Sequence, residues 1–340
     1  MRPGTLTILT DTTPASQSES NPTRSLELHS AFIEARLPDR ARSSFAWLGL
    51  LAAGSLLASA QEPPAKGGGA SLADADSDVM RRVISGAKEA ERALYLYERI
   101  ERVESRKEAG DAAPQSVKIS RVVPAGTGIA KIPLGPDGKP SDAEAYRNEL
   151  NKLLNSLTWA AASGQPQREA YQKVQKKQKD RDDLIEATHS AFIFRFLDQE
   201  PRDGRMLAKY RMEPNPKFKS TNRATSIFAK VKGFVWVDEK ANELARVEGE
   251  VTDDISLGAF LAKVYKGSRF MQDRYEMVSG LWLPSFTQYD FDGRKFFTSF
   301  SVHEKTFYSA YKKIGPPAEA IPQIQSEIAQ LDAAKSAENR

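Results

Sequence analysis

Residues 233–251 read GFVWVDEKANELARVEGEV and give the clearest indication of the fold class. Two β-prone runs flank the polar segment DEKAN (residues 238–242), whose composition is typical of a tight turn. In the returning run Val247 and Val251 share one face, whereas the first run is apolar at adjacent positions as well, so both of its faces are partly covered. The stretch therefore predicts an antiparallel β-hairpin inside a larger sheet.

Strand-like runs continue on both sides of this hairpin, at intervals of roughly 10–15 residues. They read AFIFRFLDQE, MLAKYRMEP, FLAKVYKG, RFMQDRYEMV, LWLPSFTQYDF and KFFTSFSVHEKTFY. No long helical pattern separates them, so we expect a meandering antiparallel sheet. The dipeptide Asp292-Gly293 predicts a tight hairpin turn, because such turns need residues that tolerate positive φ.

Helical spacing marks the rest of the chain. Residues 79–107 predict a helix followed by a strand. Ser141 and Glu144 match a capping box, with Ser141 as the N-cap, so a helix is expected to begin there. A second, strongly charged helix is expected over residues 168–188, and its basic run KVQKKQKDR is interpreted as a solvated face rather than as a surface for anionic lipid or a partner. The fold class is thus α+β, with a helical insertion at about 141–188.

The N-terminal region has the three parts of a secretory signal. A basic segment precedes the apolar run FAWLGLLAAGSLL (residues 45–57), and Ala58-Ser59-Ala60 follows it. We predict cleavage between Ala60 and Gln61, which makes residues 1–60 an over-long start plus a signal peptide. A Pro- and Gly-rich linker is expected at 61–77.

The main domain is expected at 78–315. Residues 316–340 have an apolar stripe on a polar helix, so this C-terminal segment is expected either to dock or to extend freely.

Composition excludes several classes of function. The chain has 340 residues, 49 Lys and Arg against 45 Asp and Glu, and no cysteine. The charges are interspersed, so no clustered basic face indicates nucleic acid. Without cysteines there is no thiolate metal site, thiol nucleophile or disulfide. Of the histidines, His189 and His303 fall in the mature part, and neither lies beside a nucleophile motif. We therefore expect no enzyme activity, metal or cofactor.

Aromatic side chains on the strands are the candidate ligand-binding residues. They form either a plain core or the wall of a dry, curved cavity that accepts acyl chains. The candidates are Phe192, Phe194, Phe196, Tyr210, Phe234, Trp236, Phe260, Tyr265, Trp282 and Phe286.

Residues 188–314 resemble the outer-membrane lipoprotein-sorting (LolA/LolB-type) superfamily. In that family a strand of the form G-x-W-I-D, a turn and a returning strand with Arg and Glu form one hairpin of the curved sheet. Gly233, Trp236, Asp238, Arg246 and Glu248 stand in those places here. The resemblance implies a half-open antiparallel barrel with helices packed at its mouth. It also implies carriage of lipidated proteins or other lipophilic ligands through the periplasm.

Together, the sequence patterns and the resemblance lead to the hypothesis of a soluble, non-catalytic carrier or binding protein for a lipophilic ligand. We expect it to be periplasmic or secreted, in a Gram-negative cell envelope. The expected ligand is a lipid or lipidated protein, and a membrane-associated partner is a further expectation. No nucleic acid partner and no membrane span after signal cleavage are expected. The alternative is a non-enzymatic envelope scaffold whose sheet is only a structural core.

Overall fold

The computed structural model describes residues 72–340 apart from 111–112, 221–223, 258–261, 297 and 339–340. These described residues belong to a single unit of the chain. The predicted signal sequence with Ala60 and Gln61, and the candidate Phe260, lie outside the described residues.

Long α-helices lie before the first strand, between the third and fourth strands and after the last strand, and the other strands follow one another with mostly short connections. In order, the elements are α3 (Leu72–Ala93), the 3₁₀ helix η1 (Leu94–Leu96), β1 (Tyr97–Arg106), β2 (Ser116–Pro124), β3 (Ile129–Leu134), α4 (Ala143–Ala161), α5 (Gln165–Ala191), β4 (Phe192–Arg202), β5 (Arg205–Pro214), the 3₁₀ helix η2 (Thr225–Lys230), β6 (Val231–Asp238), β7 (Glu243–Val251), β8 (Ile255–Leu257), β9 (Ala262–Val264), β10 (Arg269–Val278), β11 (Leu281–Lys295), β12 (Thr298–Lys313) and α6 (Pro317–Glu338).

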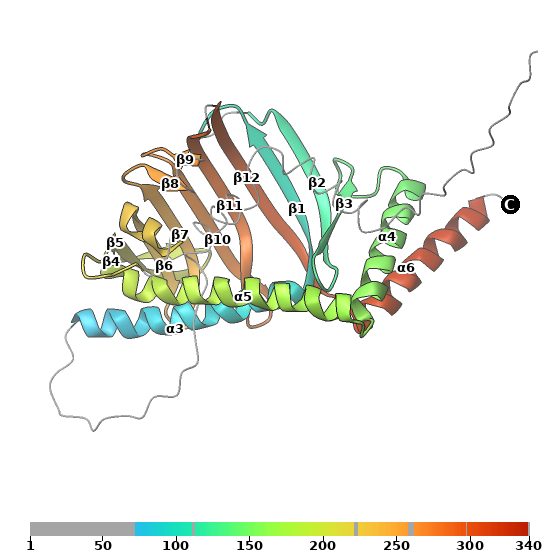
Figure 1. Cartoon of the computed structure of the whole chain (residues 1–340), viewed down its shortest axis with the longest axis horizontal. Helices are drawn as coiled ribbons and strands as arrows, with labels where there is room; N and C mark the ends of the chain where they lie inside the picture. Colours follow the sequence, from blue (N-terminus) through green and yellow to red (C-terminus); the bar gives the residue numbers. More distant parts are fainter. Residues whose placement is uncertain (1–71, 111–112, 221–223, 258–261, 297, 339–340) are drawn as a thin grey trace, which may run out of the picture. The chain divides into compact units, whose positions relative to one another are not determined.

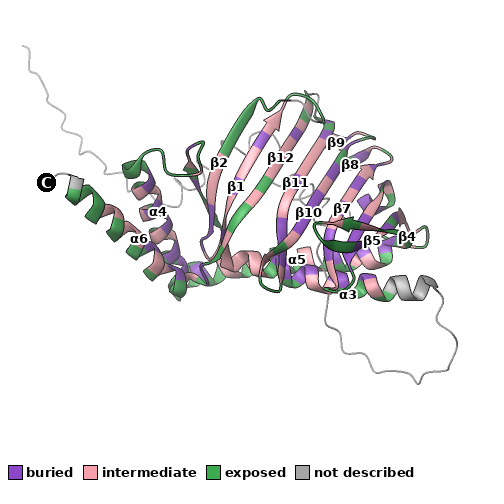
Figure 2. Cartoon of the chain, turned by 180° about the vertical axis from the view of Figure 1, so that it is seen from behind, coloured by how far each residue is buried: buried purple, intermediate pink, exposed green. Residues whose placement is uncertain are grey.

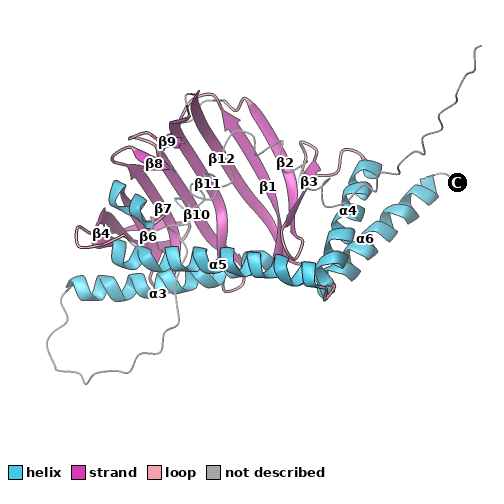
Figure 3. Cartoon of the chain, viewed as in Figure 1, coloured by secondary structure: helices cyan, strands magenta, loops and turns pink. Residues whose placement is uncertain are grey.

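All strands of the described residues belong to one twelve-stranded antiparallel sheet (Figures 1 and 3). Its order is β3-β2-β1-β12-β11-β10-β7-β6-β5-β4, and the β8–β9 hairpin pairs beside β11. The path from β4 to β12 is the expected meander, while β1 returns to pair with the last strand, for example Glu101 opposite Tyr308. The strands β3 and β4 end the path without pairing to each other, so the sheet is curved but not closed. The predicted α+β fold with an open antiparallel sheet is confirmed.

Alternation along the strands gives this sheet two distinct faces. Val235 and Val247 are buried on the helix-side face, which packs against α3, α5 and η2. The ring of Phe228 in η2 lies 5.4 Å from that of Phe192 in β4. Trp236 and Glu248 point to the opposite face, named here the groove face. In Figure 1, α3 and α5 lie side by side across one end of the strands, and Figure 2 shows the same strands from behind, coloured by burial.

A second core lies between α4, α6 and the β2–β3 hairpin. Leu150, Leu153 and Leu157 of α4 are buried against Ile314 and Ile324 at the C-terminal end of the chain. Of the two outcomes expected for the C-terminal segment, α6 docks.

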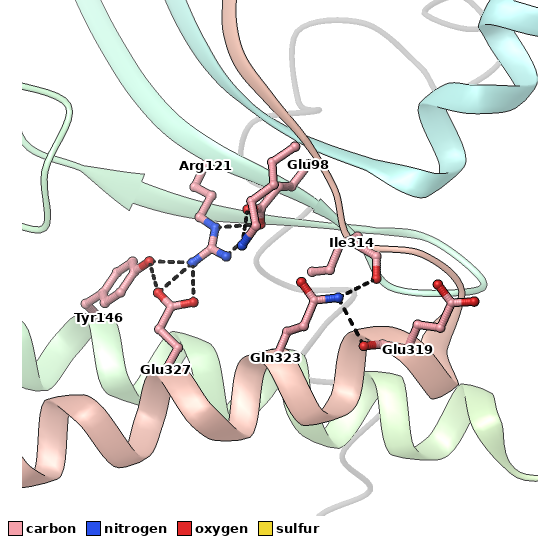
Figure 4. Close-up of polar contacts among 8 residues, drawn as sticks. Glu98, Arg121, Tyr146, Ile314, Glu319, Gln323 and Glu327 are labelled. Atoms are coloured by element: carbon pink, nitrogen blue, oxygen red, sulfur yellow. Dashed lines mark hydrogen bonds and ion pairs between the residues drawn. The ribbon is translucent and has the colours of Figure 1, made fainter. Parts of the chain in front are cut away.

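One ion network holds α6 to the sheet (Figure 4). Arg121 of β2 pairs with Glu98 of β1 at 2.6 Å and with Glu327 of α6 at 2.7 Å. The Tyr146 hydroxyl donates to Glu327 at 2.8 Å and accepts from Arg121 at 2.6 Å. Burial raises the pKa of Tyr146 to about 12, so this hydroxyl stays protonated and remains a donor at neutral pH. The network therefore connects α4, α6 and two strands at one point.

Two local predictions were wrong. The N-cap of α4 is Asp142 rather than Ser141, because the Asp142 carboxylate accepts the amides of Glu144 and Ala145 at 2.8 and 2.9 Å. The dipeptide Asp292-Gly293 does not form a turn, since β11 continues to Lys295 and Gly293 pairs with Phe300. Gly293 is needed for close approach instead. A Cβ there would overlap the carbonyl oxygen of Lys263 in β9.

Candidate ligand-binding site

A groove of about 910 Å³ opens on the groove face of the sheet. Strand side chains of one parity form its walls, and glycine backbone forms part of its floor. The groove is lined by Ala109, Gly110, Arg211, Met212, Glu213, Lys232, Gly233, Phe234, Glu248, Gly249, Glu250, Gly267, Arg269, Phe270, Met271, Gln288, Asp290 and Asp292. Five neighbouring strands therefore contribute to it: β5, β6, β7, β10 and β11.

Charged side chains of both signs contribute to this lining beside apolar ones. Arg269 lies 3.8 Å from Glu250, so part of the charge is paired within the groove. Asp290 accepts a hydrogen bond from Gln288 at 2.5 Å and lies 3.2 Å from Nδ1 of the buried His303. Asp292 lies 3.6 Å from Nε2 of the same ring. Two carboxylates thus hold His303 in place, which is the ordinary structural role expected for a buried histidine.

Aromatic side chains lie next to the charged groove on the same face. Leu207, Trp236, Ala245 and Trp282 form a buried cluster, named here the Trp236 cluster, and Phe234 packs against it. Phe234 also lines the groove. The groove and the Trp236 cluster are therefore continuous through this one ring.

Cations fix the position of Trp236 within the cluster. Its ring lies between Lys209, whose Nζ is 5.0 Å from the ring centroid, and Arg246, whose Cζ is 5.4 Å from it. The indole nitrogen donates to Glu200 at 2.8 Å, and Lys209 donates to the same carboxylate at 2.5 Å. The ring is thus held on both faces and at its polar edge.

The other residues of the resemblance motif build the β6–β7 hairpin. A Cβ on Gly233 would overlap the backbone of Glu248, so the strands need glycine here. Asp238 accepts the amides of Lys240 and Ala241 at 3.0 Å and so caps the turn. Arg246 pairs with Glu248 at 2.5 Å across the groove face. These contacts stabilise the hairpin and define no reaction.

The candidate residues that the structure describes do not form one site. Phe234, Trp236 and Trp282 come together in and around the Trp236 cluster. Phe192 and Tyr210 are buried in the helix-side core, where the Tyr210 hydroxyl donates to Glu239 at 2.8 Å.

Of the four other described candidates, Phe194 and Phe196 lie beside the helix-side pair, with rings 6.3 Å from Phe192 and 5.7 Å from Tyr210, whereas Tyr265 and Phe286 lie apart from both sets. Phe194 is half-buried and Phe196 is exposed on the edge strand β4. Tyr265 is half-buried just after β9. Phe286 is half-buried on the groove face, with its ring 5.1 Å from that of Phe307.

A polar cluster on the helix-side face was not anticipated from the sequence. Arg274 of β10 is only 1% exposed, and burial lowers its pKa although the charges of Glu91 in α3 and Glu243 in β7 act in the opposite direction. Burial likewise raises the pKa of Tyr308 to about 12. Charged residues near Arg274, such as Asp273 and Glu276, occur at both odd and even positions of the strand. The sequence pattern therefore did not indicate that one cation is buried.

Two further properties concern only the part of the chain that the structure describes. No group of three or more His, Asp or Glu side chains there is arranged to hold a metal ion. None of its helices combines the length and apolar character needed to cross a bilayer.

The fold and the site thus define an α+β protein with an open antiparallel sheet. Helices pack on one face of this sheet, and the groove lies on the other face. No family model and no curated protein matches the chain. Two solved structures are similar to it. One is described as an outer membrane lipoprotein-sorting protein domain from Vibrio parahaemolyticus, with 12% identity, coverage of 71% of this chain and 93% of that chain, and a TM-score of 0.29. The other is a LolA superfamily protein from Nitrosomonas europaea, with 10% identity, coverage of 70% and 93%, and a TM-score of 0.28.

Proposed function

We propose that this chain is a non-catalytic binding protein that carries an amphiphilic ligand, either a lipid or a lipidated protein, in the bacterial periplasm. The periplasmic location rests on the signal-like segment at residues 45–60. The ligand class rests on the groove.

The observation that supports this function best is the size and chemistry of the groove. Its volume of about 910 Å³ lies within the range of roughly 300–1,000 Å³ that is typical of small-molecule sites. Charged side chains such as Arg211, Lys232 and Asp290 line it, and they suit a polar headgroup or the peptide part of a lipidated protein. Phe234 leads from there to an apolar cluster that suits an aliphatic chain. A ligand with one polar and one apolar part matches both regions.

Native mass spectrometry of the processed protein, purified from the periplasm without detergent, tests this function. We expect a co-purifying mass of lipid size that organic solvent releases. A clean mass of the protein alone, with no uptake of added fatty acid or phospholipid, would contradict the carrier function and favour the scaffold alternative.

A pair of matched variants locates the ligand. Phe234→Ala removes the ring shared by the groove and the Trp236 cluster, so we expect bound lipid to fall several-fold. Phe194→Ala removes a half-buried ring from the helix-side face of β4 and serves as the control, with wild-type occupancy expected. Equal losses in both variants would mean that the groove is not the binding site.

A further inference from the structure

The tip of the β4–β5 hairpin (residues 202–207) extends beyond the backbone pairing of its neighbours. β5 pairs with β6 only from Ala208, opposite Val237, to Met212, opposite Gly233. The earlier residues of β5 therefore have no backbone partner on β6, and Met206 is 52% exposed. Side chains alone connect this tip to the strands that lie beneath it.

Ion pairs and one hydrogen bond connect the tip to β6 and β10. Arg202 forms two bonds to Asp273, at 2.9 and 3.1 Å. Arg205 pairs with Asp238 at 3.0 Å and with Glu276 at 2.8 Å. The Tyr275 hydroxyl donates to Asp203 at 2.6 Å. Arg205 is partly exposed, so water and salt screen its pairs and each contributes little.

The tip lies over the Trp236 cluster. The Cζ atom of Arg205 stands 5.0 Å from the centroid of the Trp282 ring, and Leu207 of the tip is itself buried in the cluster. Trp236 meets β4 through Glu200. The β4–β5 tip, which charged contacts hold in place, thus covers the outer side of the Trp236 cluster. On the inner side of the cluster, Phe234 connects it to the groove.

We propose that the Trp236 cluster is the binding subsite for the aliphatic chain of the ligand, and that the β4–β5 tip covers this subsite. The inference rests on the proposed function and assigns the two ends of the ligand. The acyl chain displaces the tip, including Leu207, from Trp236 and Trp282, while the polar end stays in the charged groove. An aliphatic chain fits because the cluster is built from Leu, Ala and Trp side chains, and Nε1 of Trp236 already has its acceptor in Glu200.

Uptake of cis-parinaric acid by the processed protein, followed by stopped-flow fluorescence, tests the covering role of the tip. The Arg202→Gln/Arg205→Gln double variant removes the tip's pairs with Asp273, Asp238 and Glu276. We expect it to take up the probe about five-fold faster than the wild type at low salt. The wild-type rate should rise toward that of the variant in 0.5 M NaCl, because salt screens the partly exposed pairs of Arg205. Arg147→Gln breaks a partly exposed pair with Asp332 on α6 and should keep the wild-type rate.

Quenching by dibromostearic acid tests the position of the chain. Trp159→Phe leaves both cluster tryptophans, and its emission should fall by more than half on binding. Trp236→Phe/Trp282→Phe leaves Trp159 at the exposed end of α4, and its emission should stay unchanged; Trp47, where it remains, is common to both variants.

The outcomes separate the two proposals. Uptake with equal rates in all proteins, no effect of salt and no quenching in Trp159→Phe would overturn the subsite while leaving the carrier function intact. Absence of uptake in every protein and at every salt concentration would overturn the carrier function as well. If the double variant does not fold, the salt dependence of the wild-type rate still decides the role of the tip.

Discussion

At the scale of single residues, Glu243 shows how the helix-side core constrains one charge. Burial raises the pKa of its carboxyl from the usual 4.5 to about 7, against the attraction of Arg274, and the negative charges of Glu89 and Asp238 add to the shift. Gly86 of α3 makes room for it, because a Cβ there would lie 2.7 Å from the Glu243 carboxylate. In the folded protein the Glu243 carboxyl is therefore about half protonated near neutral pH.

The sign of the resulting pH dependence follows from this shift. The folded protein holds the proton more tightly than the unfolded chain, so the contribution of Glu243 to the free energy of unfolding falls as pH rises from about 4.5 to about 7. We expect Glu243→Gln to raise that free energy by about 1 kcal/mol at pH 8, after solvent screening, and to change little at pH 4. Urea denaturation at both pH values measures the difference. Glu169→Gln on the exposed side of α5 is the control, and an equal effect of both variants would refute the role of Glu243.

Gly293 is a second position at which one atom decides the local structure. Gly293→Ala places a Cβ on the carbonyl oxygen of Lys263, so β9 must move away from β11. We expect a loss of about 1–3 kcal/mol in the free energy of unfolding. Gly128→Ala, where no atom lies within 4 Å of the added Cβ, should cost well under 1 kcal/mol. Hydrogen exchange should show faster exchange confined to β9 and β11. A uniform increase over the whole sheet would contradict this explanation.

At the scale of elements, Arg121 determines how α6 attaches to the sheet. Arg121→Ala leaves Glu98, which is buried, without its main partner, because the Lys312 Nζ lies 3.7 Å away on an exposed side chain. Removing one member of a buried pair costs about 3–5 kcal/mol, so we expect a loss near the lower end of that range. Arg147→Ala removes the pair between Arg147 of α4 and Asp332 of α6, both of whose side chains are partly exposed, and should cost far less. Urea denaturation of the two variants measures the contrast. Similar losses would show that burial of the Arg121 network is unimportant.

The elements also show how far local patterns predict structure. The hairpin at residues 233–251, the meander and the helix before β1 follow from alternation and turn chemistry, which act over a few residues. The pairing of β1 with β12 joins segments separated by most of the chain, and no local pattern specifies it. The dipeptide Asp292-Gly293 wrongly predicted a turn because its role also depends on another segment. The strand β9 lies against Gly293, and the residues next to Gly293 do not show this. The aromatic candidates were divided by the register of each strand, which sends Tyr210 and Trp236 to opposite faces.

At the scale of the whole described unit, the groove and the second core have no residue in common. No α6 residue lines the groove, whereas Leu150, Leu153 and Leu157 of α4 depend on Ile324 for their burial. Truncation after Gly315 therefore removes a structural support but leaves the proposed binding site complete. We expect the truncated protein to bind the dye ANS through the uncovered face of α4 and to exchange its α4 amides faster.

Lipid uptake by the same truncated protein should stay within about two-fold of the full chain, because its groove and Trp236 cluster are unchanged. Circular dichroism checks that the sheet persists, and parinaric acid titration measures binding. Loss of uptake with an intact sheet would place α6 in the ligand site and contradict the assignment to the groove face. Retained uptake together with ANS binding would show that the C-terminal helix supports the fold of α4, while ligand binding belongs to the strands β5, β6, β7, β10 and β11.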